Sequence, residues 1–430
     1  MIDSSKWLPA EQLVEVMTRI YKLRLTTPSG GNISMMDDEG NVWLTPSQID
    51  KGRLQPSDIV KICPDGSIVG KHDPTSEYPF HLGIYNSRPD IKAIVHSHPC
   101  ALVAFSITNC NTDFRLVPAL LKSGNLLGFT SYCIPGSDEL AKVVSEGFSK
   151  GNDAIIMENH GIITSGANLL SAFQYLENLE ALATIYLNCK RIGSPIYLSD
   201  EQLLRSNICL PLIQPKNSGT IPDENEQNLR KELVHYMKRA YSRNLSTATS
   251  GCWSVRIDKN SYLIVPEGID ANYLETSDIV RIKSDGLQEN NILSHYFKLH
   301  QSIYNTHSEV NAICCAMPVF LMAFAVSDAS FDTRTIPESY IVLQNVPELE
   351  FDGFYTNVLE IQKSITNSSP CAIVQNECFL ATGSSLFQVF DRVEVAEFTA
   401  QSIIDSRLLG PISPISEYAI SALKRRYLSD

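Results

Sequence analysis

The sequence predicts two tandem domains of the α/β class. Blocks of similar sequence occur twice along the chain in the same order, and strand and helix patterns alternate within each copy. The composition agrees with this prediction. Of the 430 residues, 43% are apolar, which is enough to build a packed core in each copy.

The repeat is visible in blocks that keep a nearly constant offset. DIVKICPDG begins at Asp58 and DIVRIKSDG at Asp278, 220 positions later. IYNSRPDIKAIVHSHP begins at Ile84 and IYNTHSEVNAICCAMP at Ile303, 219 positions later. A period of this length indicates two globular units rather than a solenoid.

The repeat also predicts the domain boundaries. We expect one domain at residues 1–205 and a degenerate copy of it at residues 228–430. The segment 206–227 between them is rich in Pro, Asn and Ser, which is typical of a linker.

The elements follow from apolar spacing, at helical period in some segments and in short apolar runs in others. Expected helices are Leu8–Tyr21, Glu77–Tyr85 (ending before Pro89), Asp138–Phe148 and Leu169–Leu187. Expected strands are Asn41–Leu44, Asp58–Ile62, Lys92–His98 and Ala154–Met157. In the second copy, Ala312–Val326 is expected to be a buried strand that runs into a helix.

Charge and composition argue against several classes of protein. Acidic residues outnumber basic ones, 48 to 35, so the surface as a whole repels a phosphate backbone and no nucleic-acid partner is expected. The longest apolar stretch, residues 312–326, is too short for a membrane span. The N-terminus lacks a secretory pattern, and the 11 cysteines have no regular spacing. We therefore expect a reduced, cytoplasmic protein with no membrane partner.

Three histidines are candidate metal ligands. His96 and His98 are two apart on an expected strand, so both imidazoles lie on one face, and Pro99 ends the strand beside them. His160 follows the strand Ala154–Met157, and Gly161 is expected to permit a sharp turn after it. Two histidines two apart on a strand, or a single histidine in a turn, more usually have a plain structural role.

Glu77 is the candidate acidic ligand. It lies four residues before His81 on an expected helix, so the two side chains share a face. Its position in the first turn, after Thr75 and Ser76, is also favourable for a carboxylate without any function.

The second copy serves as an internal control for these four residues. It keeps the surrounding motifs but aligns Glu77 with Tyr296, His96 with Cys315, His98 with Met317 and His160 with Glu377. Joint loss of the set is what a shared site predicts. Three imidazoles and a carboxylate favour zinc, although manganese, cobalt or iron can bind the same groups. His81 aligns with His300 and is retained, which indicates a role in the scaffold or in supporting a ligand.

An anion site is a further expectation. The loop Pro28-Ser-Gly-Gly-Asn-Ile-Ser is rich in glycine and hydroxyl groups, and such loops present backbone N–H groups to phosphate. A plain turn is the more usual reading of this loop alone. Ser47 and the Thr75-Ser76 helix start strengthen the anion reading.

Taken together, SGGNIS, LTPS, TSEYPFH, VHSHP and ENHG resemble the class II aldolase/adducin family over about Glu11 to Asp200. The resemblance implies a three-layer α/β/α domain with a central, mainly antiparallel sheet. It implies zinc held by His96, His98, His160 and Glu77, with Glu77 leaving the metal to act as acid and base. It implies substrate phosphate at Gly31, Asn32, Ser47, Thr75 and Ser76.

The activity that the resemblance implies is that of a zinc-dependent aldolase, a lyase. Such an enzyme cleaves a ketose phosphate to dihydroxyacetone phosphate and an aldehyde through a metal-stabilised enediolate. One departure is Gln48, which stands where the family usually has glycine. Another is Leu116-Val117-Pro118, which lacks the tyrosine that the aldolases take from a neighbouring subunit.

In the aldolases that tyrosine is the acid for the leaving aldehyde, and the second copy suggests a source for the missing group. Its matching stretch contains Glu338 and Tyr340, and we hypothesise that Tyr340 or Glu338 reaches the first-domain site. Family sites lie between subunits of a fourfold ring, so the expected assembly is a homodimer that forms a pseudo-tetramer.

Three alternative functions stay open at this point. An L-ribulose-5-phosphate 4-epimerase-like isomerase would use the same metal, but the epimerases have Asp where Glu77 stands. A non-enzymatic adducin-like scaffold describes the second copy better than the first. The residue Gln48 also leaves room for an enzyme with unphosphorylated substrates.

Overall fold

The computed structural model describes residues 7–108, 110, 113–121, 126–206, 222–283 and 296–428. It contains two compact units. The N-terminal unit comprises Asp3–Phe114 and Leu121–Ala183, and the C-terminal unit comprises Met1–Ile2, Arg115–Leu120 and Thr184–Asp430. Most of the predicted linker, residues 207–221, lies outside the described residues.

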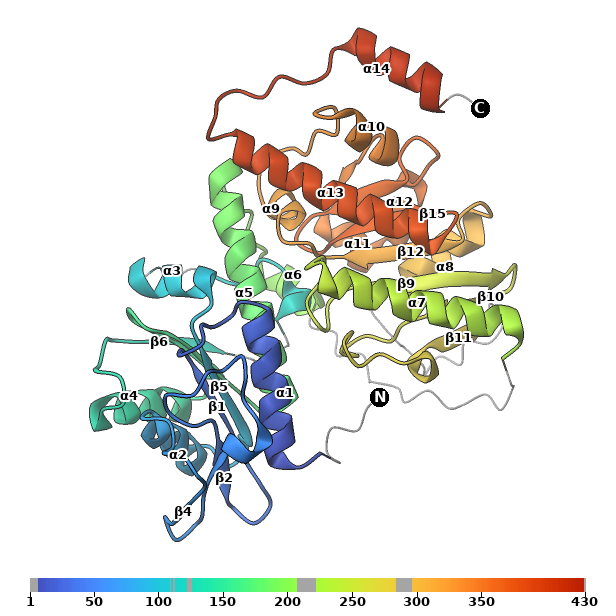
Figure 1. Ribbon diagram of the computed structural model, residues 1–430. Helices are drawn as coiled ribbons and strands as arrows, with labels where there is room; N and C mark the ends of the chain where they lie inside the picture. The colour runs from blue at the N-terminus through green and yellow to red at the C-terminus, as the bar shows by residue number, and fades with distance from the viewer. Residues whose placement is uncertain are drawn as a thin grey trace. The chain divides into compact units, whose positions relative to one another are not determined.

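The N-terminal unit is built on an eight-stranded sheet (Figure 1). The strand order is β4-β3-β2-β1-β5-β8-β7-β6, and every neighbouring pair is antiparallel except β6 and β7. The strands are β1 Asn32–Met36, β2 Val42–Leu44, β3 Val60–Ile62, β4 Ile68–Val69, β5 Ala93–Ser97, β6 Leu127–Thr130, β7 Ala154–Met157 and β8 Gly161–Gly166.

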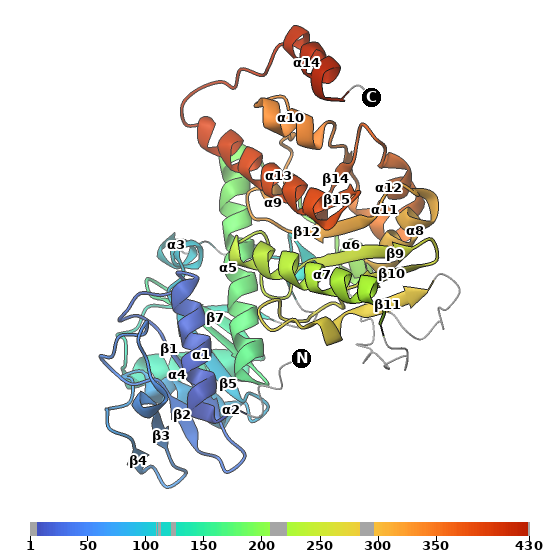
Figure 2. The same cartoon turned by 45° about the vertical axis from the view of Figure 1, so that its right-hand side comes forward.

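Helices cover both faces of this sheet. They are α1 Pro9–Lys22, α2 Tyr78–Ser87, α3 Cys100–Thr108, α4 Asp138–Ser149 and α5 Leu169–Ile192. Helices α2 and α4 lie together on one face (Figures 1 and 2), where Phe80 and Val144 join a buried cluster with Ile94 of β5. On α1, the Arg19 guanidinium lies 4.5 Å from the ring centre of Phe173 in α5, which places these two helices side by side.

The C-terminal unit repeats this architecture in a seven-stranded sheet of order β11-β10-β9-β12-β15-β14-β13. Again one neighbouring pair, β13 and β14, is parallel and the others are antiparallel. The strands are β9 Cys252–Asp258, β10 Ser261–Ile264, β11 Val280–Lys283, β12 Ala312–Ala316, β13 Glu348–Leu349, β14 Cys371–Val374 and β15 Cys378–Gly383.

The helices of this unit begin with α6 Asp200–Ser206 and α7 Glu224–Ser242 and end with α13 Leu386–Ser406 and α14 Glu417–Leu423. Between them lie α8 Phe297–Thr306, α9 Leu321–Ala325, α10 Pro337–Leu343, α11 Phe351–Thr356 and α12 Val358–Ser364. Short 3-10 turns occur at Pro56–Asp58, Pro118–Leu120 and Thr276–Asp278, and a π-helical turn at Lys424–Leu428. The predicted three-layer α/β/α fold in two tandem copies, with a mainly antiparallel sheet, is confirmed.

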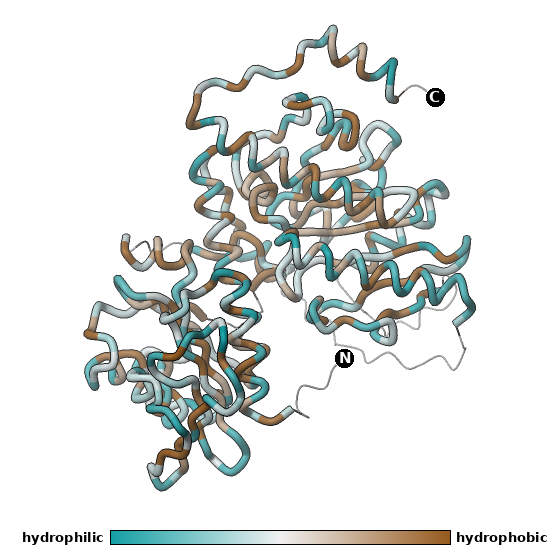
Figure 3. Tube along the Cα trace, viewed as in Figure 1, coloured by the Kyte–Doolittle hydropathy of each residue, from teal (hydrophilic) through white to brown (hydrophobic). Residues whose placement is uncertain are grey.

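Most elements expected from the sequence are present within a few residues of their predicted ends. Ala154–Met157 is strand β7 as expected, and Ala312–Val326 contains β12 followed by α9. The long helices alternate hydrophilic and hydrophobic positions along their length, as Figure 3 shows. In the described part of the chain, no helix combines the length and the apolar character that crossing a membrane requires.

Candidate metal centre

Strand β5 aims His96 at the N-terminal end of α2. Side chains alternate along a strand, so His96 shares the face of Ile94, which packs in the cluster under α2 and α4. Its neighbour across the sheet is Asn32 of β1. His96 is fully buried, and its ring lies edge-on to Phe80 of α2 with 5.7 Å between ring centres.

One hydrogen bond fixes the orientation of the His96 ring. Its Nδ1 lies 3.0 Å from the carbonyl oxygen of Ile162, so Nδ1 carries the proton and donates it, leaving Nε2 free to ligate. His98 follows β5 directly, and its Nε2 lies 3.1 Å from Nε2 of His96. The two nitrogens therefore converge on one point.

His160 comes from the tight turn between β7 and β8. The prediction that Gly161 supplies this turn is wrong, because Asn159 adopts the left-handed conformation with φ of 52° and Gly161 already begins β8. Glycine is required at 161 for space. A Cβ there would lie 2.5 Å from Cδ2 of His98 and 2.5 Å from the carbonyl oxygen of Ser97.

Glu77 caps the start of α2 and completes the group. Its Oε2 lies 3.3 Å from Nε2 of His96, and its Oε1 lies 3.4 Å from Nε2 of His160. The Asn32 amide donates a hydrogen bond of 2.7 Å to Oε2. Glu77 as a whole residue is 7% exposed, so it is held inside the unit rather than on the helix surface.

These four side chains fit a divalent metal ion. The ligating nitrogens of His96, His98 and His160 all lie within 4.8 Å of one another. Zinc–nitrogen bonds of about 2.0–2.1 Å in a tetrahedron place neighbouring ligand atoms about 3.3 Å apart. The contacts of 3.1, 3.3 and 3.4 Å agree with this spacing. In addition, Glu77 Oε1 is buried without a hydrogen-bond partner, as a metal-binding oxygen would be.

The pKa shifts of these side chains also favour metal binding. Burial by itself raises the pKa of Glu77, but the charges and hydrogen bonds of His96, His160 and Asn32 outweigh it and hold the pKa well below its usual range. Burial, and then the charge on His96, lowers the pKa of His98 to about 3 and that of His160 to about 4. Burial lowers the pKa of His96, but Glu77 outweighs it and raises that pKa. A metal ion would displace the proton that His96 and Glu77 share.

The expected phosphate loop is joined to its neighbouring segments by hydrogen bonds. The N–H of Ile33 donates to Oγ1 of Thr45 (3.2 Å), and the N–H of Thr75 donates to the carbonyl of Thr45 (3.3 Å). The N–H of Ser47 donates to the carbonyl of Asp73 (3.0 Å). The segments that carry Gly31, Asn32, Ser47, Thr75 and Ser76 are thus neighbours. Both polar atoms of the Asn32 amide are already engaged, with Glu77 and with His81.

Lys51 is a further polar residue of this region, and it was not predicted from the sequence. It is 3% exposed, and its Nζ donates a hydrogen bond of 2.7 Å to the carbonyl of Pro46. Burial lowers the pKa of Lys51 to about 8. The signal was available in the repeat, where Lys51 aligns with Ala271 and so changes together with the metal ligands.

Gln48 has an unusual backbone. Its φ is 55°, in the left-handed region that glycine prefers, and the aligned residue of the C-terminal unit is Gly268 with φ of 79°. The backbone shape of the turn is therefore kept in both units, and Gln48 adopts it in spite of its side chain.

The two residues proposed to supply an acid differ in accessibility. Tyr340 lies in α10, is 4% exposed, and has the Lys424 ammonium 6.0 Å from its ring centre. Glu338, in the first turn of the same helix, is exposed. Their role in catalysis stays a prediction.

In the C-terminal unit, two of the positions aligned with the N-terminal site, Tyr296 and Glu377, are joined by a hydrogen bond. The hydroxyl of Tyr296 donates to Oε1 of Glu377 and the hydroxyl of Tyr355 donates to Oε2, each at 2.8 Å. Glu377 is fully buried. Among the described residues, no other group of three or more His, Cys, Asp or Glu side chains is arranged like His96, His98 and His160.

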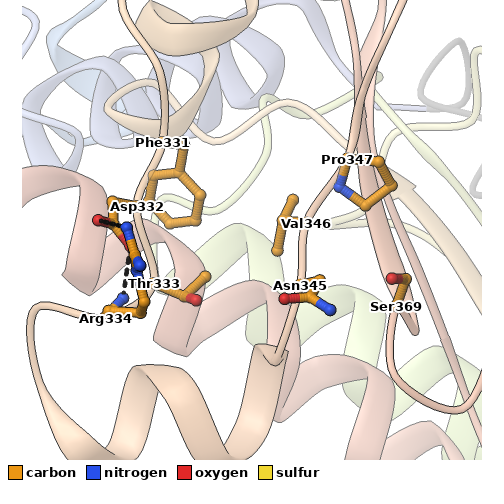
Figure 4. Close-up of a pocket in the computed structure, with 8 residues that line it drawn as sticks. All are labelled: Phe331, Asp332, Thr333, Arg334, Asn345, Val346, Pro347 and Ser369. Carbon is orange, nitrogen blue, oxygen red and sulfur yellow. Dashed lines mark hydrogen bonds and ion pairs between the residues drawn. The ribbon is translucent and has the colours of Figure 1, made fainter. Parts of the chain in front are cut away.

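A pocket of about 280 Å³ lies in the C-terminal unit, lined by residues 331–334, 345–347 and 369 (Figure 4). Arg334 supplies its positive charge, but the guanidinium is already paired with Asp332 at 3.0 Å and with Glu417 at 3.0 Å. None of the predicted site residues lines this pocket.

Comparison with known proteins finds a family match in both halves. The family described as "Class II Aldolase and Adducin N-terminal domain" matches residues 11–187 and again residues 231–404. L-fuculose phosphate aldolase of Escherichia coli strain K12 is 33% identical over 204 residues, 45% of this chain and 90% of that protein.

Two further relatives carry different names. The 5-deoxy-D-ribulose 1-phosphate aldolase of Bacillus thuringiensis is 31% identical over 196 residues, 45% of this chain and 91% of that protein. The 3-oxo-tetronate 4-phosphate decarboxylase of Haemophilus influenzae is 30% identical over 199 residues, 45% of this chain and 93% of that protein. Each match has about the length of one copy.

Proposed function

Because the chain belongs to the class II aldolase and adducin family, we propose that it is a zinc-dependent aldolase that cleaves a ketose phosphate to dihydroxyacetone phosphate and an aldehyde. The observation that carries this proposal is the cluster of His96, His98 and His160, whose ligating nitrogens lie within 4.8 Å of one another, with the Glu77 oxygens 3.3 Å and 3.4 Å from two of them. The names of the two aldolase relatives support a sugar phosphate as substrate.

The proposed roles follow from the positions of the side chains. His96, His98 and His160 hold the metal, which as a Lewis acid would polarise the substrate's carbonyl group. Glu77 is ionised and has one oxygen without a hydrogen-bond partner, so it can accept a proton from the substrate. Its second oxygen stays anchored to the Asn32 amide, which keeps the base in place.

Substrate phosphate would lie at the loop of Gly31 and the neighbouring Ser47, Thr75 and Ser76. Gly31 has φ of 67°, a conformation that turns backbone N–H groups toward a common anion. The buried ammonium of Lys51 would add positive charge to this region. Its hydrogen-bonded partner is a neutral carbonyl, so a phosphate dianion would balance the charge.

A decarboxylase is a second candidate, because a relative of similar identity has that name. Both reactions break the bond between the α and β carbons of a ketone and leave an enolate, which a metal bound at this site would stabilise. An epimerase is less favoured, because the acidic ligand is Glu77 rather than the aspartate of that class.

The test combines metal analysis with product analysis. The purified protein should contain zinc, and a panel of ketose 1-phosphates should release dihydroxyacetone phosphate from at least one member. Release of carbon dioxide from 3-oxo acid phosphates alone would instead assign the decarboxylase, and absence of bound divalent metal would exclude both enzymes.

Substitution of Glu77 supplies the matched test. We expect Glu77→Gln to lower kcat by at least about 100-fold, because the amide cannot accept the proton. Tyr296→Phe changes the aligned position of the C-terminal unit, so it should leave turnover within about twofold of the original. Equal losses in both variants would indicate a general effect on folding and contradict the assignment of Glu77.

A further inference from the structure

A line of buried polar side chains runs through the N-terminal unit and ends at Glu77. Tyr85 Oη lies 2.7 Å from Ser34 Oγ, which lies 2.7 Å from His81 Nδ1. His81 Nε2 lies 2.6 Å from Asn32 Oδ1, and Asn32 Nδ2 lies 2.7 Å from Glu77 Oε2. All five side chains are buried, and His81 and Ser34 have no exposed surface.

The periods of a helix and a strand make this line possible. Glu77, His81 and Tyr85 are four residues apart at α2, which advances about 6 Å per step. Asn32 and Ser34 are two apart on β1, which advances about 6.6 Å. The two rows therefore stay in register, and each strand side chain bonds to two helix side chains.

The direction of every hydrogen bond follows from the carboxylate at the end. An ionised Glu77 only accepts, so the amide N–H of Asn32 donates and its Oδ1 must accept from Nε2–H of His81. A neutral imidazole has one N–H, so Nδ1 accepts from the Ser34 hydroxyl. Ser34 in turn accepts from Tyr85. All donors point toward Glu77, and bonds in such a chain strengthen one another.

The C-terminal unit contains the same hydrogen-bonded Tyr, Ser and His side chains, but these do not lead to a carboxylate. Ser254 lies 2.8 Å from Nδ1 of His300 and 2.8 Å from the hydroxyl of Tyr304. The next contact is Nε2 of His300 with the thiol of Cys315 at 3.5 Å. Cys252 stands in place of Asn32, so the line stops before the position that corresponds to Glu77.

We infer that Tyr85, Ser34 and His81 are positioning residues that orient the Asn32 amide and, through it, the Glu77 carboxylate. With Oε2 held by Asn32, Oε1 faces His160 and the metal position. The inference rests on the proposed role of Glu77 as a metal ligand. Breaking the line at Ser34 releases the His81 ring, so the Asn32 amide that His81 holds, and with it Glu77, is fixed less firmly in the ligating orientation.

The test is direct measurement of zinc affinity by competition with a chromophoric chelator. Ser34→Ala interrupts the line, and we expect a loss of affinity of about 10- to 100-fold, as for other groups that orient metal ligands. Tyr85→Phe removes the outermost donor alone and should give a smaller loss. Tyr85→Phe also tests the inference if Ser34→Ala does not fold.

Ser254→Ala and Tyr304→Phe are the matched controls, because they break the same contacts in the unit where the line ends at a thiol. Both should leave zinc affinity unchanged, although each pair of variants should lower the melting temperature to a similar degree. Unchanged affinity in Ser34→Ala, or equal losses in Ser34→Ala and Ser254→Ala, would overturn the inference.

A second measurement keeps this inference separate from the proposed function. Nitrogen-15 NMR of labelled histidine in the metal-free protein should find His81 as the neutral Nε2–H tautomer. The Nδ1–H tautomer or a charged ring would overturn the inference even if zinc binds. If the original protein fails to bind zinc while the Nε2–H tautomer is found, the line is supported and the proposed function is the part that fails.

Discussion

At the scale of single residues, the repeat gives pairs of positions in which one copy keeps a backbone conformation and the other changes the side chain. Gln48 and Gly268 are such a pair, with φ of 55° and 79°. A residue with a Cβ costs roughly 1–2 kcal/mol in this conformation, whereas glycine adopts it freely. Replacing Gln48 with glycine would therefore relieve this backbone strain.

We predict that Gln48→Gly raises the free energy of unfolding by about 0.5–1 kcal/mol, the net of relieved strain and a more flexible unfolded chain. Thermal denaturation should record a higher melting temperature for the N-terminal unit. Gly268→Ala should act in the opposite direction in the C-terminal unit. A lower melting temperature for Gln48→Gly would show that contacts of the glutamine side chain outweigh the strain.

The sequence was sufficient to predict that four side chains lie together, since they changed together between copies. Their role as metal ligands stays a prediction. The sequence did not reveal Ser34 or Tyr85, because both are retained as Ser254 and Tyr304. Retention in both copies is what a scaffold residue shows. The link to Glu77 depends on the Asn32 amide, a contact between distant parts of the chain that spacing alone does not encode.

At the scale of elements, each unit fixes the helix after its central strand with a carboxylate from a later helix. Glu180 of α5 accepts from the N–H groups of Ala101 (2.8 Å) and Leu102 (2.9 Å) at the start of α3. Glu397 of α13 accepts from Phe320 (3.0 Å) and Leu321 (2.8 Å) at the start of α9. Two donors that a helix start leaves unpaired are satisfied in this way.

These carboxyls predict a pH dependence of stability. Burial raises the pKa of Glu180 and of Glu397 to about 7 in the folded chain, above the ordinary value of 4.5. The folded state therefore binds more protons than the unfolded state between about pH 4.5 and 7, and this contribution to stability is lost as the pH rises through 7.

Glu397→Gln and Glu180→Gln remove this ionisation. Relative to the original protein, each variant should gain several degrees of melting temperature on going from pH 5 to pH 8, in the unit that carries it. A difference in melting temperature that does not vary with pH would contradict the raised pKa.

Strong periodicity predicted the long helices and the buried strands, whereas short elements were missed. Strand β4 has two residues and strand β1 follows a glycine-rich loop, so neither carries a clear local signal. Strand β4 is placed by its short hairpin with β3, and strand β1 is placed by pairing with β5, a partner that lies far along the chain. The turn at Asn159 was assigned to Gly161 because either residue type tolerates a left-handed backbone.

At the scale of the whole molecule, two units of one fold differ in that the cluster of three histidines lies in the N-terminal unit. We predict about one zinc ion per 47.8 kDa chain, measured by elemental analysis of the protein after dialysis. His98→Ala should reduce this value to near zero, and Glu377→Gln should leave it unchanged. Two ions per chain would contradict the assignment of the C-terminal unit.

Removal of the metal should also make the two units unfold at different temperatures. A ligand present at about 100 times its Kd stabilises the folded state by about 2.7 kcal/mol. A chelator should therefore lower the melting temperature of the unit that contains His96 and His98 and leave the other transition in place. If both transitions shift equally, the two units do not unfold independently.

The cluster of Tyr296, Glu377 and Tyr355 has a consequence for metal binding in the C-terminal unit. Tyr355 comes from α11 and is not one of the four aligned ligand positions, yet its hydroxyl satisfies half of the Glu377 carboxylate. Placing Glu, His, His and His at the aligned positions would remove the hydrogen bond that the Tyr355 hydroxyl gives to Glu377. Glu377→His alone would break both hydrogen bonds, and a hydrogen bond contributes about 0.5–1.5 kcal/mol, so this change is expected to lower the free energy of unfolding. A metal site at the aligned positions of the C-terminal unit would therefore have to replace the hydrogen bonds that Tyr296 and Tyr355 give to Glu377.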